Sequence, residues 1–310
     1  MMIRDIKPED YTQLAELLSL SRGRPFSIEQ LKKAGRGLKI WHTQVAVQDN
    51  NCVVGTYALS QGESDGHGRY QLHIDVHPDQ QRQGIGTALY QDAVQFAQTN
   101  GLSSLYTYVG ERPPSGLNFA RKRGFVSTRQ AMHSELDVTA FDERPFAHYI
   151  QDNEANGYTF TSLTKLGDTQ ENRHKLYELN KTCSADIPGR GPFFTFAEYC
   201  QRRFESHAYT PNGVILALKD EQWIGMSAAT YHQTGNFVFN EMTGVLPTDR
   251  RRGLAVALKL LVIRFAQTVG ADVVRTFNDS ENIAMLTVNR RLGYQFLPGS
   301  YTMELKFNDA

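Results

Sequence analysis

The chain has 310 residues, of which 40% are hydrophobic and 21% charged, and its formal net charge is zero. This composition is typical of a folded globular protein, and the length exceeds the roughly 100–200 residues of one domain, so two domains are favoured. The balanced charge gives no support for a nucleic-acid partner or an anionic membrane surface.

Cysteine usage and the N-terminal segment favour a cytoplasmic protein. Cys52, Cys183 and Cys200 form no C-x-x-C pair, so neither a disulfide framework nor a zinc cluster is expected. The segment MMIRDIKPEDYTQL is acidic and has no apolar centre, so we do not expect a signal peptide. The longest apolar run, LAVALKLLVIRFA, is interrupted by Lys259 and Arg264 and is too short to span a bilayer.

The hydrophobic periodicity of the first half predicts alternating strands and helices. In chain order these are a strand at 3–6, helices at 8–20 and 27–37, a hairpin at 43–61, a strand at 69–76, a helix at 86–98, a strand at 103–109 and a short helix at 115–125. This order predicts an α/β fold with a mixed sheet and helices on its faces.

The second half repeats the first. Gly253 aligns with Gly84, and the same offset continues without a gap to Gly293-Tyr294, which aligns with Gly124-Phe125. The repeat predicts a strand from residue 158, a hairpin at 213–232 and a strand at 236–245. A period this long indicates a duplicated domain and not a solenoid.

A short motif between a strand and a helix occurs in both copies. In the first copy it consists of Gln81, Arg82, Gln83, Gly84, Ile85 and Gly86, and in the second of Arg250, Arg251, Arg252, Gly253, Leu254 and Ala255. Small residues, arginines and the free N–H groups of a helix start together favour binding of a pyrophosphate. The pattern lacks the G-K-[ST] of a nucleotide-triphosphate loop and the third glycine of a dinucleotide loop. The simpler alternative is an ordinary, well-capped helix start.

These motifs resemble those of the GNAT acyltransferase superfamily. The segments VHPDQQRQGIGTAL and VLPTDRRRGLAVALK are similar to its acyl-CoA-binding motif, and NDSENIAMLTVNRRLGY is similar to the motif that follows. The resemblance covers two tandem domains, which we expect at residues 1–148 and 158–310 with a boundary at 149–157, as in the architecture of mycothiol synthase. It implies acetyl-CoA as the acyl donor and a small-molecule amine as the acceptor.

The resemblance also implies catalytic roles. Backbone N–H groups at Val245 and Val76 would donate to the thioester carbonyl, and Glu241 would serve as general base. Strict alternation places Glu241 on the strand face of Thr243 and Val245, and the gapless offset makes Leu72 its equivalent. The alternative for Glu241 is a solvated strand carboxylate.

Further positions distinguish the copies. The family often carries Asn and Tyr where the second copy has Asn282 and Asn289 and the first has Pro113 and Ala120. The resemblance thus implies that Asn282 contacts the cofactor and that Asn289 hydrogen-bonds the sulfur without protonating it. We expect the second domain to be catalytic and the first to be non-catalytic, with acyl-CoA binding possible there.

Three alternatives stay open at this point. Asp186 either meets the acceptor amine or caps a helix. His73, Asp75 and His77 alternate on one strand face, but we expect packing there and no metal. The absence of the usual Tyr favours a second hypothesis, a non-catalytic acyl-CoA-binding or scaffold protein. The sequence does not determine the oligomeric state.

Overall fold

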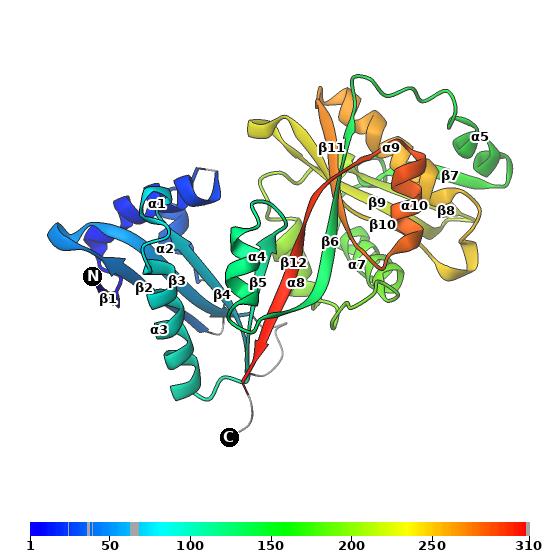
Figure 1. The fold of residues 1–310 in the computed structure, drawn as a ribbon. Helices are drawn as coiled ribbons and strands as arrows, with labels where there is room; N and C mark the ends of the chain where they lie inside the picture. The colour runs from blue at the N-terminus through cyan, green and yellow to red at the C-terminus, as the bar shows by residue number, and fades with distance from the viewer. Residues whose placement is uncertain (24, 36–37, 39, 63–67, 308–310) are drawn as a thin grey trace. The chain divides into compact units, whose positions relative to one another are not determined.

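The structure, a computed structural model, describes residues 1–23, 25–35, 38, 40–62 and 68–307 (Figure 1). By its contacts the chain divides into two compact units. The first comprises Met1–Thr128 with Tyr301–Ala310, and the second comprises Arg129–Ser300.

The elements of the first half follow the predicted order. They are β1 (Met2–Asp5), α1 (Tyr11–Arg22), α2 (Ile28–Lys33), β2 (Ile40–Val47), β3 (Val53–Gln61), β4 (Arg69–Val76), α3 (Ile85–Thr99), β5 (Ser104–Gly110), α4 (Ser115–Arg121) and β6 (Val126–Asp137). Ser27 caps α2 in the predicted capping box with Gln30.

The second half repeats this order with two additional helices, one before its first strand and a short one after it. Its elements are α5 (His148–Ala155), β7 (Tyr158–Ser162), α6 (Leu163–Leu166), α7 (Gln170–Ser184), α8 (Phe196–Arg203), β8 (Val214–Lys219), β9 (Gln222–His232), β10 (Phe237–Val245), α9 (Leu254–Thr268), β11 (Val273–Asp279), α10 (Ile283–Arg291) and β12 (Gln295–Lys306). The mixed α/β fold is confirmed. The predicted turn at Asp220 and Glu221 joins β8 to β9, and both residues have positive φ.

The two units exchange their last strands. The strand order is β1-β2-β3-β4-β5-β12 in the first unit and β6-β11-β10-β9-β8-β7 in the second. The boundary expected at 149–157 therefore lies inside the second unit, and most of that segment forms α5. The compact units differ from the sequence repeat because each sheet takes a strand from the other half of the chain.

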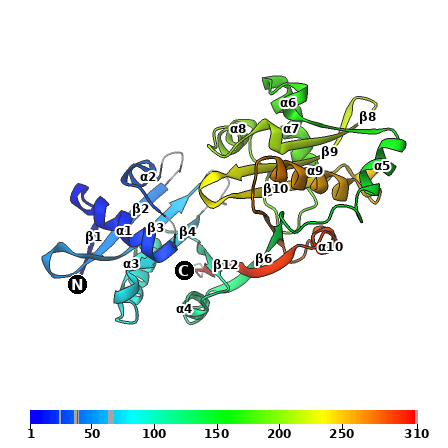
Figure 2. The same ribbon diagram turned by 90° about the horizontal axis from the view of Figure 1, so that it is seen from above.

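Helices cover both faces of each sheet. In the first unit, α3 lies along β3 and β4 (Figure 1), while α1 packs on the other side against Val45, Val47 and Val53. In the second, Gly225 of β9 lies opposite Val245, the residue that follows Gly244 on β10. A Cβ at Gly244 would meet Cys183 of α7, and one at Gly225 would meet Leu258 of α9. Because neighbouring positions face opposite sides, α7 and α9 cover opposite faces of β9 and β10 (Figure 2).

Candidate active site

The second unit contains a parallel strand pair that separates partway along its length. β10 and β11 pair as far as Phe239 and Arg275. β11 then stays with β6, whereas β10 continues against β9 to Val245. The sheet therefore opens between the ends of β10 and β11. The first unit repeats this arrangement, since the pairing of β4 with β5 ends at Gln71.

Val245 presents its backbone to this opening. The Leu246 N–H donates to β9 over 2.8 Å, so Leu246 occupies a hydrogen-bonded position of the antiparallel ladder. The preceding residue of such a strand turns its N–H and C=O the other way, which directs those of Val245 toward the opening. In the first unit the His77 N–H donates to β3 over 3.0 Å, so Val76 has the same orientation.

Glu241 is the extra residue of a β-bulge. The register of β10 against β9 shifts between Asn240 and Met242. The prediction that Glu241 shares a face with Thr243 and Val245 is therefore wrong. Val245 packs in the core with α9, whereas Glu241 contacts α8. The additional residue reverses the alternation of side chains along the strand.

The predicted equivalence of Glu241 and Leu72 is also wrong, by one residue. β4 pairs with β3 without a register shift from Gln71 to Val76. Counted from the equivalent residues Val76 and Val245, Leu72 corresponds to Asn240. Glu241 thus has no counterpart on β4, and the gapless offset ends at the bulge.

The carboxylate of Glu241 lies beside a buried guanidinium. Arg203, on α8, places Nη1 2.8 Å from Glu241 Oε2, and the two side chains are 9% and 28% exposed. The Arg203 guanidinium also lies 5.3 Å from the centre of the Tyr199 ring. Asn180 of α7 donates to the Tyr199 hydroxyl, and burial raises the pKa of that hydroxyl. A partly exposed carboxylate, a guanidinium and a phenol therefore meet on the α7–α8 face of β10.

The loop after β10 has the form of an anion site. Gly253 is the N-cap of α9 with φ of +80°, and Arg251 has φ of +66°. The first helical bonds run from Val256 and Ala257 to Gly253 O, so earlier N–H groups have no partner within the helix. Arginines and a helix N-terminus together attract a phosphate group.

Helix α5 supports this loop from the side. Asn153 donates to Arg252 O over 3.0 Å, and a Cβ at Gly253 would lie 2.5 Å from the Tyr149 ring. The Tyr149 hydroxyl accepts from Arg291 of α10 over 2.8 Å. The loop is therefore held by α5, a helix that the sequence analysis did not predict.

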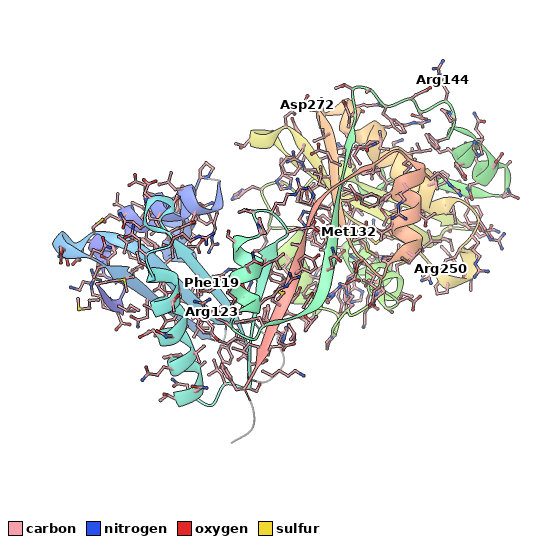
Figure 3. The ribbon with its side chains drawn as sticks, viewed as in Figure 1. Phe119, Arg123, Met132, Arg144, Arg250 and Asp272 are labelled. Atoms are coloured by element: carbon pink, nitrogen blue, oxygen red, sulfur yellow. The ribbon has the colours of Figure 1, made fainter. Side chains whose placement is uncertain are left out.

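Arg250, labelled in Figure 3, connects the loop to the sheet opening through its hydrogen bonds. Its Nε donates to Val245 O over 3.0 Å, and its Nη1 donates to Asp186 over 2.6 Å. Asp186 thus forms an ion pair, while its side chain stays 62% exposed. The neighbouring Pro188 accepts from Arg129, which also pairs with Asp279 at the end of β11. The loop between α7 and α8 is therefore linked to the ends of both separated strands through Arg250 and Arg129.

The equivalent loop of the first unit is more open. Gln81 donates to Val76 O over 3.3 Å, in the same position as Arg250. Gly84 has φ of +85°, and a Cβ added there would have no described atom within 4 Å. Arg123 stacks on Phe119 and donates to Thr87 in the first turn of α3 (Figure 3). This loop therefore has a cation beside it but no counterpart of the covering helix α5 among the described residues.

Asn282 and Asn289 lie at the two ends of α10. Asn282 is the N-cap, and its Oδ1 accepts from the Met285 N–H. Asn289 is completely buried and donates to Asn278 of β11 over 2.8 Å. Its Oδ1 has no hydrogen-bond partner among the described residues. The Asn282 contact caps α10, and the Asn289 contact holds α10 on β11. The predicted contacts of both residues with the cofactor stay predictions.

Sequence reasoning missed Arg203, Asn240 and Lys259. Lys259 lies in the apolar run of α9 and is 1% exposed, with its amine bonded to the side chain of Asn240. The sequence did carry a signal for Lys259, because this lysine stands at helical spacing from apolar residues on both sides that are buried in the structure. Arg203 gave no such signal, because its helix shows a basic C-terminal turn that is common on protein surfaces.

The alternating trio of the first unit is engaged in protein contacts. Asp75 forms an ion pair with Arg22 at 2.6 Å and accepts from Ser21. Burial lowers the pKa of His73. In the part of the chain that the structure describes, no group of three or more His, Cys, Asp or Glu side chains is placed to hold a metal ion.

Comparison with known proteins finds one family in both halves of the chain. The model of the Acetyltransferase (GNAT) family matches residues 11–125 and 173–294. A mycothiol acetyltransferase of Stackebrandtia nassauensis is 25% identical over 237 residues, covering 75% of this chain and 73% of its own. One of Frankia casuarinae is 26% identical, covering 72% of this chain and 64% of its own.

Solved structures share the tandem fold. A tandem GNAT protein from the clavulanic acid biosynthesis pathway has a TM-score of 0.76 at 20% identity, covering 100% of this chain and 99% of its own. A GCN5-related N-acetyltransferase from Sphaerobacter thermophilus has a TM-score of 0.73 at 16% identity, covering 100% of this chain and 96% of its own. Among the described residues, no helix is long and apolar enough to cross a membrane.

Proposed function

Because the chain belongs to the GNAT acetyltransferase family, and so is an acyl-CoA-dependent N-acyltransferase, we propose that its second copy transfers an acetyl group from acetyl-CoA to a primary amine of a small molecule. Glu241 is the general base in this proposal. The observation that carries it is the bulge of β10, which presents a carboxylate on the α7–α8 face where the sheet opens. The first copy has no such residue on β4.

The backbone at the opening supplies the electrostatic part of the reaction. When bound, acetyl-CoA supplies a thioester whose carbonyl carbon accepts the amine and whose thiolate leaves. The Val245 N–H faces the opening and would donate to the thioester oxygen, where negative charge grows during attack. This is the one main-chain donor that the proposal requires at the thioester, and Arg250 fixes it by binding the carbonyl of the same residue.

Glu241 takes the proton in this mechanism. An alkyl amine is mostly protonated near neutral pH, so it must lose a proton before its lone pair can attack. The ammonium first loses one proton to solvent, and the neutral amine then attacks. As the C–N bond forms and the C–S bond breaks, a second proton passes from the amine nitrogen to the Glu241 carboxylate. Arg203 beside that carboxylate supplies a fixed positive charge, which limits the orientations that the carboxylate adopts.

Residues of the loop and of α10 would hold the donor. The loop residues Arg250, Arg251, Arg252, Gly253, Leu254 and Ala255 would bind the pyrophosphate through backbone N–H groups and guanidiniums. Asn282 is proposed to contact the cofactor. Asn289 is proposed to lie near the sulfur of the donor, and its Oδ1 has no hydrogen-bond partner among the described residues.

The first copy is proposed to bind acyl-CoA without catalysing transfer. Its loop keeps Arg82 and Gly84 in left-handed conformations like those of Arg251 and Gly253, and Val76 repeats the orientation of Val245. Its strand lacks the carboxylate. Titration calorimetry with CoA should give a stoichiometry near two, and a value near one would restrict binding to a single copy.

The acceptor is proposed to be a small molecule, because the curated relatives are mycothiol acetyltransferases. Identities of 25% and 26% do not carry the relatives' substrate to this chain. We propose that the reaction takes place in the cytoplasm, since Cys52, Cys183 and Cys200 are all free.

Replacing the proposed base tests this function. Glu241→Gln should lower kcat by about 100-fold or more, because an amide cannot accept the proton. The assay follows loss of the thioester of acetyl-CoA with a panel of amino-acid amides, amino sugars and diamines. Glu178→Gln, an exposed carboxylate on α7, is the matched control and should keep wild-type turnover. Turnover of Glu241→Gln at the control rate would exclude Glu241 as the base.

A further inference from the structure

A buried polar network lies directly behind the bulge that carries Glu241. Asn240 is 2% exposed, and its side-chain amide donates to Ala228 O at 3.0 Å and to Met242 O at 3.3 Å. These carbonyls belong to residues beside the bulge, on β9 and β10. An extra residue in a strand interrupts the ladder of backbone bonds. The Asn240 amide supplies hydrogen bonds where that ladder is interrupted.

Lys259 fixes the orientation of this amide. Its amine donates to Asn240 Oδ1 at 2.7 Å and lies 4.9 Å from the centre of the Tyr294 ring. A backbone carbonyl can only accept hydrogen bonds, whatever the protonation state of the lysine, and an ammonium group can only donate them. Oδ1 of Asn240 must therefore face Lys259, and Nδ2 must face the two backbone carbonyls. Thr243 supports the same orientation by donating to Oδ1 at 3.2 Å.

A lysine at this buried position lowers the stability of the fold, because its amine loses contact with water. Its side chain is 1% exposed, and burial lowers the pKa of its amine to about 7. A methionine would fill a similar volume without a polar group to desolvate. Packing of α9 alone therefore does not require a lysine here, whereas its bond to Asn240 does.

The first copy provides an internal comparison. Asn240 corresponds to Leu72 in the strand register, and Lys259 corresponds to Tyr90 at the offset that aligns Gly253 with Gly84. The Tyr90 hydroxyl donates to Arg123 O instead. β4 shows no register shift against β3 from Gln71 to Val76. The copy without the Lys–Asn pair is thus also the copy without the bulge.

From these contacts we propose that Lys259 is a positioning residue, which holds the Asn240 amide and through it the bulge that presents Glu241. Lys259 lies on the α9 side of the sheet and Glu241 on the α8 side, so the lysine acts through the backbone and touches no reacting atom. The catalytic part of this inference rests on the proposed function. The structural part, that Lys259 maintains the bulge, does not.

The experiment compares Lys259→Met with Leu260→Met, a control at the next buried position of α9. In the protein without ligand, hydrogen exchange of the amides from Glu241 to Thr243 should be faster in Lys259→Met and unchanged in the control. The thermal midpoint should not fall, because a buried amine is removed. Unchanged exchange in Lys259→Met, or a fall in the midpoint with intact exchange, would overturn the proposal.

Turnover of acetyl-CoA with the same amine panel gives the second readout. Lys259→Met should lose about tenfold or more in kcat, with the KM for acetyl-CoA little changed, since small displacements of a base are costly. In a double-mutant cycle with Glu241→Gln this loss should disappear. An equal loss in both backgrounds would refute action through Glu241. If Lys259→Met does not fold, Asn240→Leu replaces it, and the exchange and turnover outcomes apply to it. The midpoint outcome does not apply, because this variant leaves the Lys259 amine buried without its Asn240 partner.

If Glu241→Gln keeps full turnover, the proposed function fails. The exchange measurement still decides whether Lys259 holds the bulge, so the two failures are distinguishable.

Discussion

At the scale of single residues, the second unit buries two polar side chains, Lys259 and Tyr294, beside the strand that carries the proposed base. Lys259 and the hydroxyl of Tyr294 are buried together, and that hydroxyl has no hydrogen-bond partner among the described residues. Burial raises the pKa of Tyr294, which makes it a poor proton donor for a leaving thiolate. Such groups lower stability whether or not function requires them, and proteins retain them mainly where function uses them.

The pH dependence of stability should reveal the buried amine of Lys259. Its pKa is about 7 in the folded state and about 10.4 in an unfolded chain, so the unfolded state binds more protons between these values. The free energy of unfolding therefore rises with pH across this window. Below about pH 7 the burial of the charged amine lowers the free energy of unfolding by its full amount, on the order of 4 kcal/mol. Lys259→Met should stabilise most near pH 6, and the gain should shrink toward pH 10.

Chemical denaturation of both proteins at several pH values measures this difference. Leu260→Met, which removes no titrating group, should differ from wild type by a constant amount. A stability gain of Lys259→Met that does not change with pH would contradict a depressed pKa.

At the scale of elements, the two phosphate-loop candidates share a backbone and differ in their surroundings. Gly84 and Gly253 both precede a helix with similar positive φ. Gly253 lies against Tyr149 of α5, whereas the position of Gly84 is open. The duplicated sequence therefore produced one loop that is packed from the side and one that is not.

Alanine at these two glycines separates backbone strain from crowding. Gly84→Ala should cost about 1 kcal/mol, the cost of a left-handed conformation for a residue with a Cβ. Gly253→Ala carries the same strain and an overlap with the Tyr149 ring, so it should cost about 1–3 kcal/mol more. Urea unfolding measures the loss of stability of each variant. Equal losses in the two variants would show that α5 does not pack on the loop.

Several elements could be predicted from the sequence because their signals are local. The turn at Asp220 and Glu221 and the helix after Gly253 follow from turn chemistry and periodicity. The bulge at Glu241 could not, since alternation carries no mark of an inserted residue. The covering role of α5 also escaped prediction, because its contacts are formed with residues about a hundred positions away.

At the scale of the whole molecule, the exchange of strands makes each compact unit depend on both halves of the sequence. Met303 of β12 is completely buried in the core of the first unit. Glu304 pairs with Arg69 at 3.1 Å, and the Phe307 N–H donates to Ser103 O. No pattern in the first half of the sequence indicates that a strand is missing, which is why the repeat suggested self-contained domains.

A fragment of residues 1–148 should therefore fail to form its complete fold. It lacks the strand that covers β5, and with it the core contact of Met303. A synthetic peptide of residues 295–307 should restore cooperative unfolding, measured by circular dichroism, whereas the same peptide with Met303→Asp should not. Cooperative unfolding of the fragment alone would show that the strand is dispensable.

The exchanged strand also sets the order in which the protein can be completed during synthesis. Residues 301–306 leave the ribosome after the whole second unit has been made, so the first unit waits with an uncovered strand edge at β5. An uncovered edge is a template for pairing with other chains. A chain that stops anywhere before Tyr301 would thus leave that edge open permanently, and a late truncation would damage the half of the protein that was made first.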